Sequence, residues 1–138
     1  MSALAQLNTR IEENVVIACI AGEVDLSNAA DIGSALEGSV SQRTLGLVLD
    51  LSEATYIDSA GVHLLFRLGG RLTRRRQQLR VVVPDAAPIH KIVNLAGLNW
   101  TVPQDGSVRE ALTNLRAEVA PQLGEEAWVS GPDAPLYY

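Results

Sequence analysis

The sequence contains a single cysteine, Cys19, and this scarcity excludes two kinds of architecture. One cysteine cannot form a disulfide within the chain, so no such cross-link stabilises the fold and a reducing compartment is the simpler interpretation. One cysteine and two histidines far apart in the sequence also form no metal-ligand cluster. Cys19 stands among apolar residues, and we expect it to be a small buried hydrophobic residue.

Long apolar runs are also absent. The longest one near the N-terminus covers residues 15–21, far short of the ~18 residues that a membrane span needs, and no basic segment precedes it as in a signal peptide. We therefore expect a cytoplasmic protein with no membrane partner. Eleven basic and sixteen acidic residues give a net charge of −5, which argues against direct nucleic-acid binding as the main function.

Positive charge is sparse except in one segment. Six of the eleven basic residues fall between positions 67 and 80, where no acidic residue occurs. Two interpretations are open for this segment: a solvated helix face, or a docking patch for an acidic partner surface. The six residues are Arg67, Arg71, Arg74, Arg75, Arg76 and Arg80.

With 138 residues, the chain has the length of one domain. Strand-like and helix-like apolar patterns alternate after an N-terminal hairpin. This order predicts an α/β fold, with a mixed, mostly parallel β-sheet of about five strands and about four helices. The expected strands cover residues 4–11, 15–21, 45–51, 79–83 and 100–102, and the expected helices cover residues 29–40, 59–72, 87–95 and 108–120.

Glycines mark two places in this pattern. Gly69 and Gly70 stand inside an expected helix, where each costs about 1 kcal/mol relative to alanine. Either the helix tolerates a weak centre or another element packs closely there, and close packing is the favoured interpretation. Gly97 is expected to end the helix before it in a left-handed conformation.

The composition changes at Pro121. Residues 121–138 hold three of the six prolines and three of the six aromatic residues, and no regular element is expected there. We expect a folded domain over residues 1–120 and a C-terminal extension over residues 121–138. The extension either lies along the domain, contacts a partner, or stays unordered.

Four short motifs stand at the expected element boundaries. They are Gly22-Glu23-Val24-Asp25, Leu49-Asp50-Leu51-Ser52, Asp58-Ser59-Ala60-Gly61 and Leu95-Ala96-Gly97-Leu98. Each tetrapeptide alone is a weak signal, whereas four in this order resemble the STAS domain of anti-sigma factor antagonists. The resemblance extends from about residue 8 to about residue 117.

The resemblance implies a partner-switching cycle. In this cycle the unmodified antagonist binds an anti-sigma factor serine kinase and frees the sigma factor, phosphorylation ends the binding, and a phosphatase resets the antagonist. The phosphorylated serine of the family corresponds to Ser59. Many relatives have a second serine beside it, where this sequence has Ala60, so Ser59 is the only hydroxyl residue of the motif. No cofactor is expected.

The partner-binding surface implied by the resemblance consists of Asp25, Asp58, Ser59, Ala60 and Gly61. Asp25 either contacts the partner and orients the serine, or is a turn residue. Asp58 either caps the following helix or acts directly in the function. Gly61 permits a tight helix start or a close approach of the partner.

The expected position of Ser59 at a helix start suits a phosphate. Unpaired backbone amides and a partial positive charge of ~0.5 lie there. A phosphate adds roughly −1.5 to −2 charges beside Asp58, and near Glu23 and Asp25, which repels an acidic partner surface or a nucleotide phosphate. The simpler interpretation is that Ser59 is only a helix N-cap.

Two other classes of function agree less well with the sequence. An enzyme would need Ser59 as a nucleophile with His63 or His90 as its base, yet the glycine that precedes a nucleophile elbow by two positions is missing. The other class is a non-switching STAS interaction or ligand-sensing module in a larger assembly, which would use the basic segment or the extension. The sequence does not specify the kinase, the sigma factor, the phosphatase or the oligomeric state.

Overall fold

A six-stranded sheet forms the centre of the protein in a computed structural model. The structure describes residues 4–129, with the side chains of this range except those of Asn99 and residues 120–129. The strands are β1 (Ala5–Glu12), β2 (Val15–Val24), β3 (Gly46–Asp50), β4 (Ala54–Ile57), β5 (Gln78–Val82) and β6 (Gln104–Asp105). The helices are α1 (Ala29–Ser39), α2 (Ser59–Arg74), α3 (His90–Leu95), α4 (Leu98–Thr101) and α5 (Val108–Val129).

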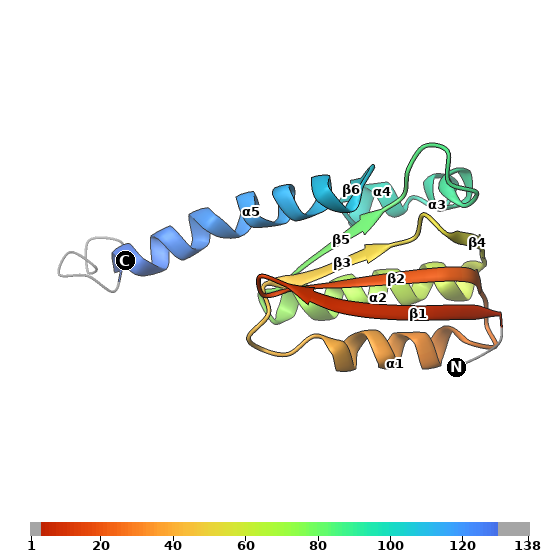
Figure 1. Ribbon diagram of the computed structural model, residues 1–138, viewed down its shortest axis with the longest axis horizontal. Helices are drawn as coiled ribbons and strands as arrows, with labels where there is room; N and C mark the ends of the chain where they lie inside the picture. The colour runs from red at the N-terminus through yellow and green to blue at the C-terminus, as the bar shows by residue number, and fades with distance from the viewer. Residues whose placement is uncertain (1–3, 130–138) are drawn as a thin grey trace.

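The arrangement of these elements confirms the expected fold class. The strand order is β1-β2-β3-β5-β6, with β4 paired to the far end of β2, and every pair except β1–β2 is parallel. Helices α1 and α2 cover one face of the sheet, and α5 covers part of the other (Figure 1). Each face therefore has its own apolar core.

The N-terminal hairpin closes with a two-residue turn. Glu12 pairs with Val15, and the residues between them, Glu13 and Asn14, have φ angles of 47° and 67°. Positive φ at both central residues is what a type I′ hairpin turn requires. The predicted hairpin is confirmed.

Gly22 lets β2 exchange one parallel neighbour for another. The strand pairs with β3 at residues 15–19 and with β4 at residues 22–24, with an irregularity after Gly22. The φ angle of Gly22 is 101°, and a Cβ there would lie 2.2 Å from the carbonyl oxygen of Leu4, so only glycine fits. The predicted strand at residues 15–21 ends too early, because this bulge carries β2 on to Val24 and creates the place for β4.

The larger core lies between the sheet and helices α1 and α2, and the smaller one lies under α5. From α1, the residues Ala29, Ile32 and Leu36 are buried, which confirms the helical periodicity. Burial of each large aliphatic side chain contributes about 1.5–3 kcal/mol. Within residues 4–129, no helix has the length and apolarity that crossing a membrane requires.

The strand expected at residues 100–102 is wrong. Gly97 adopts the predicted left-handed conformation, with a φ of 80°, and its carbonyl oxygen accepts a hydrogen bond from the amide of Trp100. This bond starts the single helical turn α4, which overrides the strand preference of Thr101 and Val102. The last strand, β6, begins only at Gln104.

The helix expected to end by Pro121 continues instead to Val129. An internal proline removes one backbone hydrogen bond and costs about 3 kcal/mol, but it does not prevent the turns beyond it. Residues 130–138 of the predicted extension lie outside the described residues.

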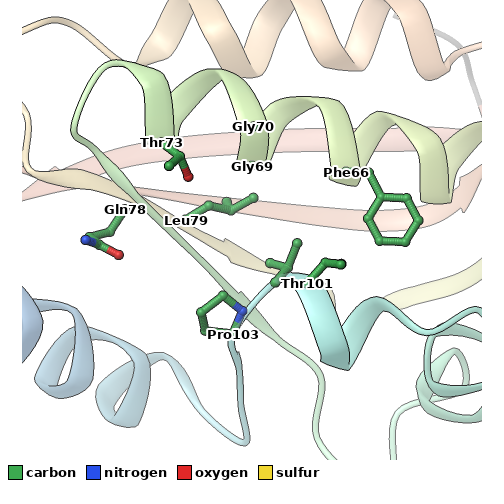
Figure 2. A pocket seen from close by; sticks show the side chains of 9 residues that line it. Phe66, Gly69, Gly70, Thr73, Gln78, Leu79, Thr101 and Pro103 are labelled. Atoms are coloured by element: carbon green, nitrogen blue, oxygen red, sulfur yellow. The ribbon is translucent and has the colours of Figure 1, made fainter.

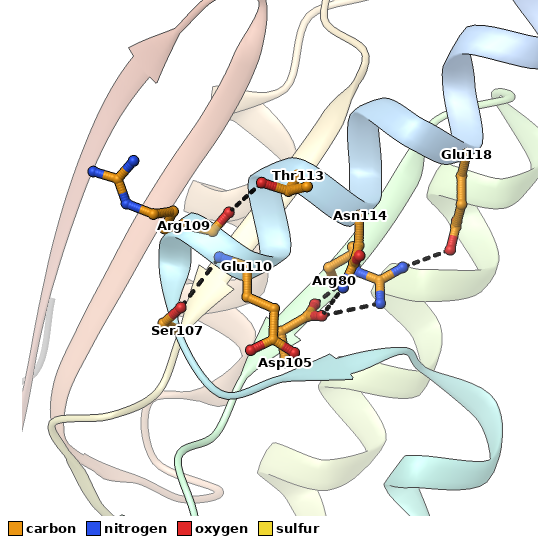
Figure 3. A network of polar contacts seen from close by, with 8 residues as sticks. All are labelled: Arg80, Asp105, Ser107, Arg109, Glu110, Thr113, Asn114 and Glu118. Atoms are coloured by element: carbon orange, nitrogen blue, oxygen red, sulfur yellow. Dashed lines mark hydrogen bonds and ion pairs between the residues drawn. The ribbon is translucent and has the colours of Figure 1, made fainter.

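A polar network ties α5 to the sheet (Figure 3). The guanidinium of Arg80 donates to both carboxylate oxygens of Asp105 at 2.6 and 3.1 Å, and to Glu118 on α5 at 2.6 Å. Asn114 on α5 also donates to Asp105, at 2.7 Å. Arg80 is 7% exposed, so the prediction of a solvated helix face is wrong for this residue, whose position on β5 turns its side chain toward α5.

Candidate functional site

Ser59 is the first residue of α2 and is exposed to solvent. Among the described residues its hydroxyl has no hydrogen-bond partner, because the preceding residue, Asp58, caps the helix instead. The amides of the first helical turn have no partners within the helix. The structure therefore presents a free hydroxyl at the positive end of a helix dipole.

Asp58 joins two segments that are far apart in the sequence. Its Oδ1 accepts a hydrogen bond from the amide of Gly61 at 3.0 Å, and its Oδ2 accepts one from the amide of Leu26 at 3.1 Å. The first bond is the helix cap that the sequence left as one of two interpretations. The second bond fixes the loop between β2 and α1 against the start of α2, so the Asp25 and Ser59 motifs form one surface.

Asp25 lies in that loop as a turn residue. Its carboxylate accepts hydrogen bonds from the amide and the hydroxyl of Ser27, and its carbonyl oxygen accepts from the amides of Asn28 and Ala29. No hydrogen bond joins Asp25 to Ser59 in the part of the chain that the structure describes. The loop brings Asp25 to the same end of the molecule, half-buried, without orienting the serine hydroxyl.

Asn28 is a loop residue whose function the sequence did not reveal. Its side chain is fully buried, accepts from the amide of Asp25 at 2.9 Å and donates to the carbonyl oxygen of Glu23 at 2.9 Å. Asn28 is the N-cap residue of α1, but its side chain makes no capping hydrogen bond and holds the preceding loop in shape instead. The conformation of the segment that carries Asp25 therefore depends on Asn28.

Gly61 is buried where α2 begins. A Cβ at this position would lie 2.5 Å from Cγ1 of Ile57 and 3.0 Å from Cγ1 of Val24. Glycine is therefore required for the tight helix start that the sequence suggested. Ala60 is half-buried and packs against the core, which leaves Ser59 as the exposed residue of the pair.

A small pocket of about 300 Å³ adjoins Ser59. Val62, His63 and Phe66 line it from α2, and Ile92 and Ala96 line it from α3 or its C-terminal end. Sequence reasoning missed the contribution of α3, because no local signal shows that it packs beside the start of α2. Two leucines near these segments are strongly exposed. Leu26 follows Asp25 in the loop and is 81% exposed, and Leu95 is the last residue of α3 and is 79% exposed.

His63 and His90 are the candidate bases that serine catalysis would need. His90 lies 3.2 Å from Asp85 and contacts Asn94, and His63 is exposed on the next turn of α2. Within residues 4–129, no hydrogen bond links either histidine to Ser59. A serine nucleophile needs such a bonded base to become reactive.

The chain is similar to known proteins in both sequence and fold. The family model described as "STAS domain" matches residues 6–111. The anti-sigma-F factor antagonist RsfB of Mycobacterium tuberculosis is 27% identical over 119 residues, which cover 84% of this chain and 95% of RsfB. An anti-sigma factor antagonist from Mycobacterium paratuberculosis, known from its crystal structure, superposes with a TM-score of 0.72 at 25% identity, covering 81% of this chain and 94% of that one.

The same fold occurs in the anti-sigma factor antagonist SpoIIAA of Bacillus. Its unphosphorylated form superposes with a TM-score of 0.66 at 17% identity, over 81% of this chain and 97% of that one. Its phosphorylated form superposes with a TM-score of 0.57 at 18% identity, over 80% and 100% of the two chains. Because the family model covers most of the sequence, the chain belongs to the STAS domain family.

Proposed function

We propose that this protein is an anti-sigma factor antagonist in a partner-switching cycle, and that phosphorylation of Ser59 switches it. The unphosphorylated form binds an anti-sigma factor serine kinase and so frees the sigma factor. The observation that carries the proposal is the exposed, unpartnered hydroxyl of Ser59 at the first position of α2. The names of RsfB and of the Mycobacterium paratuberculosis protein support the antagonist role.

A phosphate on Ser59 would leave the fold intact. The helix already has its cap in Asp58, so the serine hydroxyl can be modified without the loss of any hydrogen bond. Unpaired amides and the helix dipole stabilise a phosphate at this end by about 0.3–1 kcal/mol at an exposed site. Binding therefore changes through the surface rather than through unfolding.

The surface would become strongly acidic. Phosphorylation adds roughly −1.5 to −2 charges next to Asp58, in a region that also holds Asp25 and the exposed Glu23. Repulsion of an acidic partner surface, or of the nucleotide phosphates in a kinase, then releases the antagonist. The partner surface in this proposal comprises Asp25, Asp58, Ser59, Ala60 and Gly61, with Gly61 acting from beneath as the residue that sets the helix start.

The remaining parts of the proposal follow from the cycle. The protein is a regulatory phosphoacceptor rather than an enzyme, it acts in the cytoplasm, and a phosphatase resets it. The division into a STAS domain of residues 1–120 and an extension of residues 121–138 stays a prediction, because the family match ends at residue 111.

Phosphosite mapping tests the site. The protein is incubated with ATP and each anti-sigma factor kinase of its own organism, and the modified residue is identified by mass spectrometry. We expect one phosphate, on Ser59, and none in Ser59→Ala. Ser34→Ala, which removes an exposed serine of α1, is the control that should be labelled normally. Label on another residue, or undiminished label in Ser59→Ala, would contradict the proposal.

Binding measurements test the switch. We expect Ser59→Ala to bind the kinase as the wild type does, and Ser59→Asp to lose at least tenfold in affinity. Ser59→Asn matches aspartate in size and lacks its charge, so it should bind nearly as well as Ser59→Ala. Equal binding by the alanine and aspartate variants would instead favour a non-switching STAS interaction or ligand-sensing module.

A further inference from the structure

A second hollow, of about 610 Å³, lies away from Ser59 between the second half of α2, the start of β5 and the segment from α4 to β6. Leu79 and Val102 are apolar residues of its lining, and Pro103 lies across it from Gly69 and Gly70 (Figure 2). We call it the glycine hollow. Its volume falls in the range of small-molecule sites, about 300–1,000 Å³, and the proposed switch does not use it.

The two glycines do not serve close packing, so that prediction is wrong. A Cβ at Gly70 would meet no atom within 4 Å, and one at Gly69 would make ordinary contacts of 3.5 Å with Leu79 and Val102. Alanine would fit at both positions and would favour the helix. What the glycines provide is space, because they leave bare helix backbone along one side of the hollow.

The side chains around the hollow indicate the chemistry of its occupant. None of the lining residues is charged, and an ion held there would lack a partner, which is unfavourable. The side chain of Thr73 faces the hollow (Figure 2) and makes no hydrogen bond to any described residue. Bare backbone beside the ring of Phe66 suits a flat ring system.

The apolar surface of the hollow is recessed, which favours a small molecule over a protein. Leu79 is 5% exposed and Val102 is 3% exposed. The strongly exposed apolar side chains, which a protein partner would contact first, lie elsewhere, with Leu26, Leu95 and Trp100 the most exposed among the described residues. We propose that the glycine hollow binds a flat, neutral, largely apolar small molecule with one hydrogen-bonding group.

A fluorescent probe of this chemistry tests the proposal. N-phenyl-1-naphthylamine is neutral and aromatic, carries one N–H group, and becomes fluorescent on leaving water. We expect saturable binding of one probe molecule to the full chain, and at least tenfold weaker binding to Gly69→Leu, whose Cβ would lie 3.5 Å from Leu79 and Val102 in the lining of the hollow. Gly38→Leu is the matched control, because Gly38 is also a helical glycine with room for a Cβ and does not line the hollow.

Two further measurements locate the probe. Leu95→Ser removes an exposed apolar side chain outside the hollow and should bind the probe normally. Titration of the isotope-labelled wild type should shift the amide resonances of Thr73, Gln78 and Thr101 most strongly. Absence of saturable binding, normal binding by Gly69→Leu, or loss of binding in Leu95→Ser would each overturn the proposal. Circular dichroism melts verify that every variant is folded.

Discussion

Asp58 connects the start of α2 to the loop before α1 through two hydrogen bonds, and removal of its carboxylate tests this connection. Asp58→Ala deletes the 3.0 Å bond from the amide of Gly61 and the 3.1 Å bond from the amide of Leu26. Loss of a helix N-cap costs about 1 kcal/mol, and loss of a partly exposed hydrogen bond costs about 0.5–1.5 kcal/mol. We expect the free energy of unfolding to fall by about 2 kcal/mol.

Asp58→Asn separates the two bonds. Asparagine caps helices about as well as aspartate, so its side-chain oxygen can retain the bond from Gly61. Its NH₂ group cannot accept from the amide of Leu26. The expected loss is therefore about 1 kcal/mol, midway between the wild type and Asp58→Ala.

Urea denaturation followed by circular dichroism measures both losses. With a slope of about 1–3 kcal/mol per molar urea for a small protein, Asp58→Ala should lower the midpoint by about 1 M. Glu53→Ala, which changes an exposed carboxylate before β4, is the control and should stay within about 0.5 kcal/mol of the wild type. A loss below about 0.5 kcal/mol for Asp58→Ala would show that Asp58 does not hold the two segments together.

Three further predictions concern single residues. Gly61→Ala should destabilise the protein by about 1–3 kcal/mol in urea, because its Cβ would lie 2.5 Å from Ile57; wild-type stability would contradict this. Arg80→Met should lower the free energy of unfolding by about 3–5 kcal/mol, because Asp105 stays buried without its cation. Arg76→Met, at an exposed position, should lower it by under about 0.5 kcal/mol. Equal losses in the two variants would contradict the network. Burial, with the carboxylates of Asp50 and Glu53, raises the pKa of the Cys19 thiol from 9.0 to about 11. The pKa of the thiol is higher in the folded protein than in the unfolded chain, so the protonated thiol contributes to the free energy of unfolding. This contribution is complete below pH 9 and disappears between pH 9 and 11. Iodoacetamide at pH 8 should alkylate the native thiol about a hundredfold more slowly than the unfolded one, and equal rates would disprove the shift.

Local signals predicted the features of the fold that depend on neighbouring residues. The turn at Glu13 and Asn14 and the left-handed Gly97 follow from backbone preferences, and the helix start at Ser59 follows from apolar spacing. The short strand β4 was missed because its pairing depends on the bulge at Gly22, which only the complete sheet defines. The proline rule likewise failed at Pro121, since it gives a tendency and not an obligatory helix end.

The candidate site was predictable in its motif and unpredictable in its connections. The sequence placed Ser59 at a helix start and offered capping as one of two roles for Asp58, whereas the bond from the amide of Leu26 to Asp58 spans 32 residues. Arg80 shows the same limit, because its charge groups it with the basic segment while its strand position buries it beside Asp105. Interactions across the fold, unlike periodicity, leave no signal in a single sequence.

In the proposed switch, the fixed position of Asp58 makes charge the natural means of releasing the partner. Two hydrogen bonds hold its carboxylate in place, so it cannot turn away from a phosphate on the next residue. The first arginine of α2 after the serine is Arg67, eight residues and about 12 Å along the helix axis, beyond the screening length of about 8 Å at physiological salt. The added charge is therefore not neutralised from within α2 and acts on whatever binds this surface, and the comparison of Ser59→Asp with Ser59→Asn measures that effect apart from size.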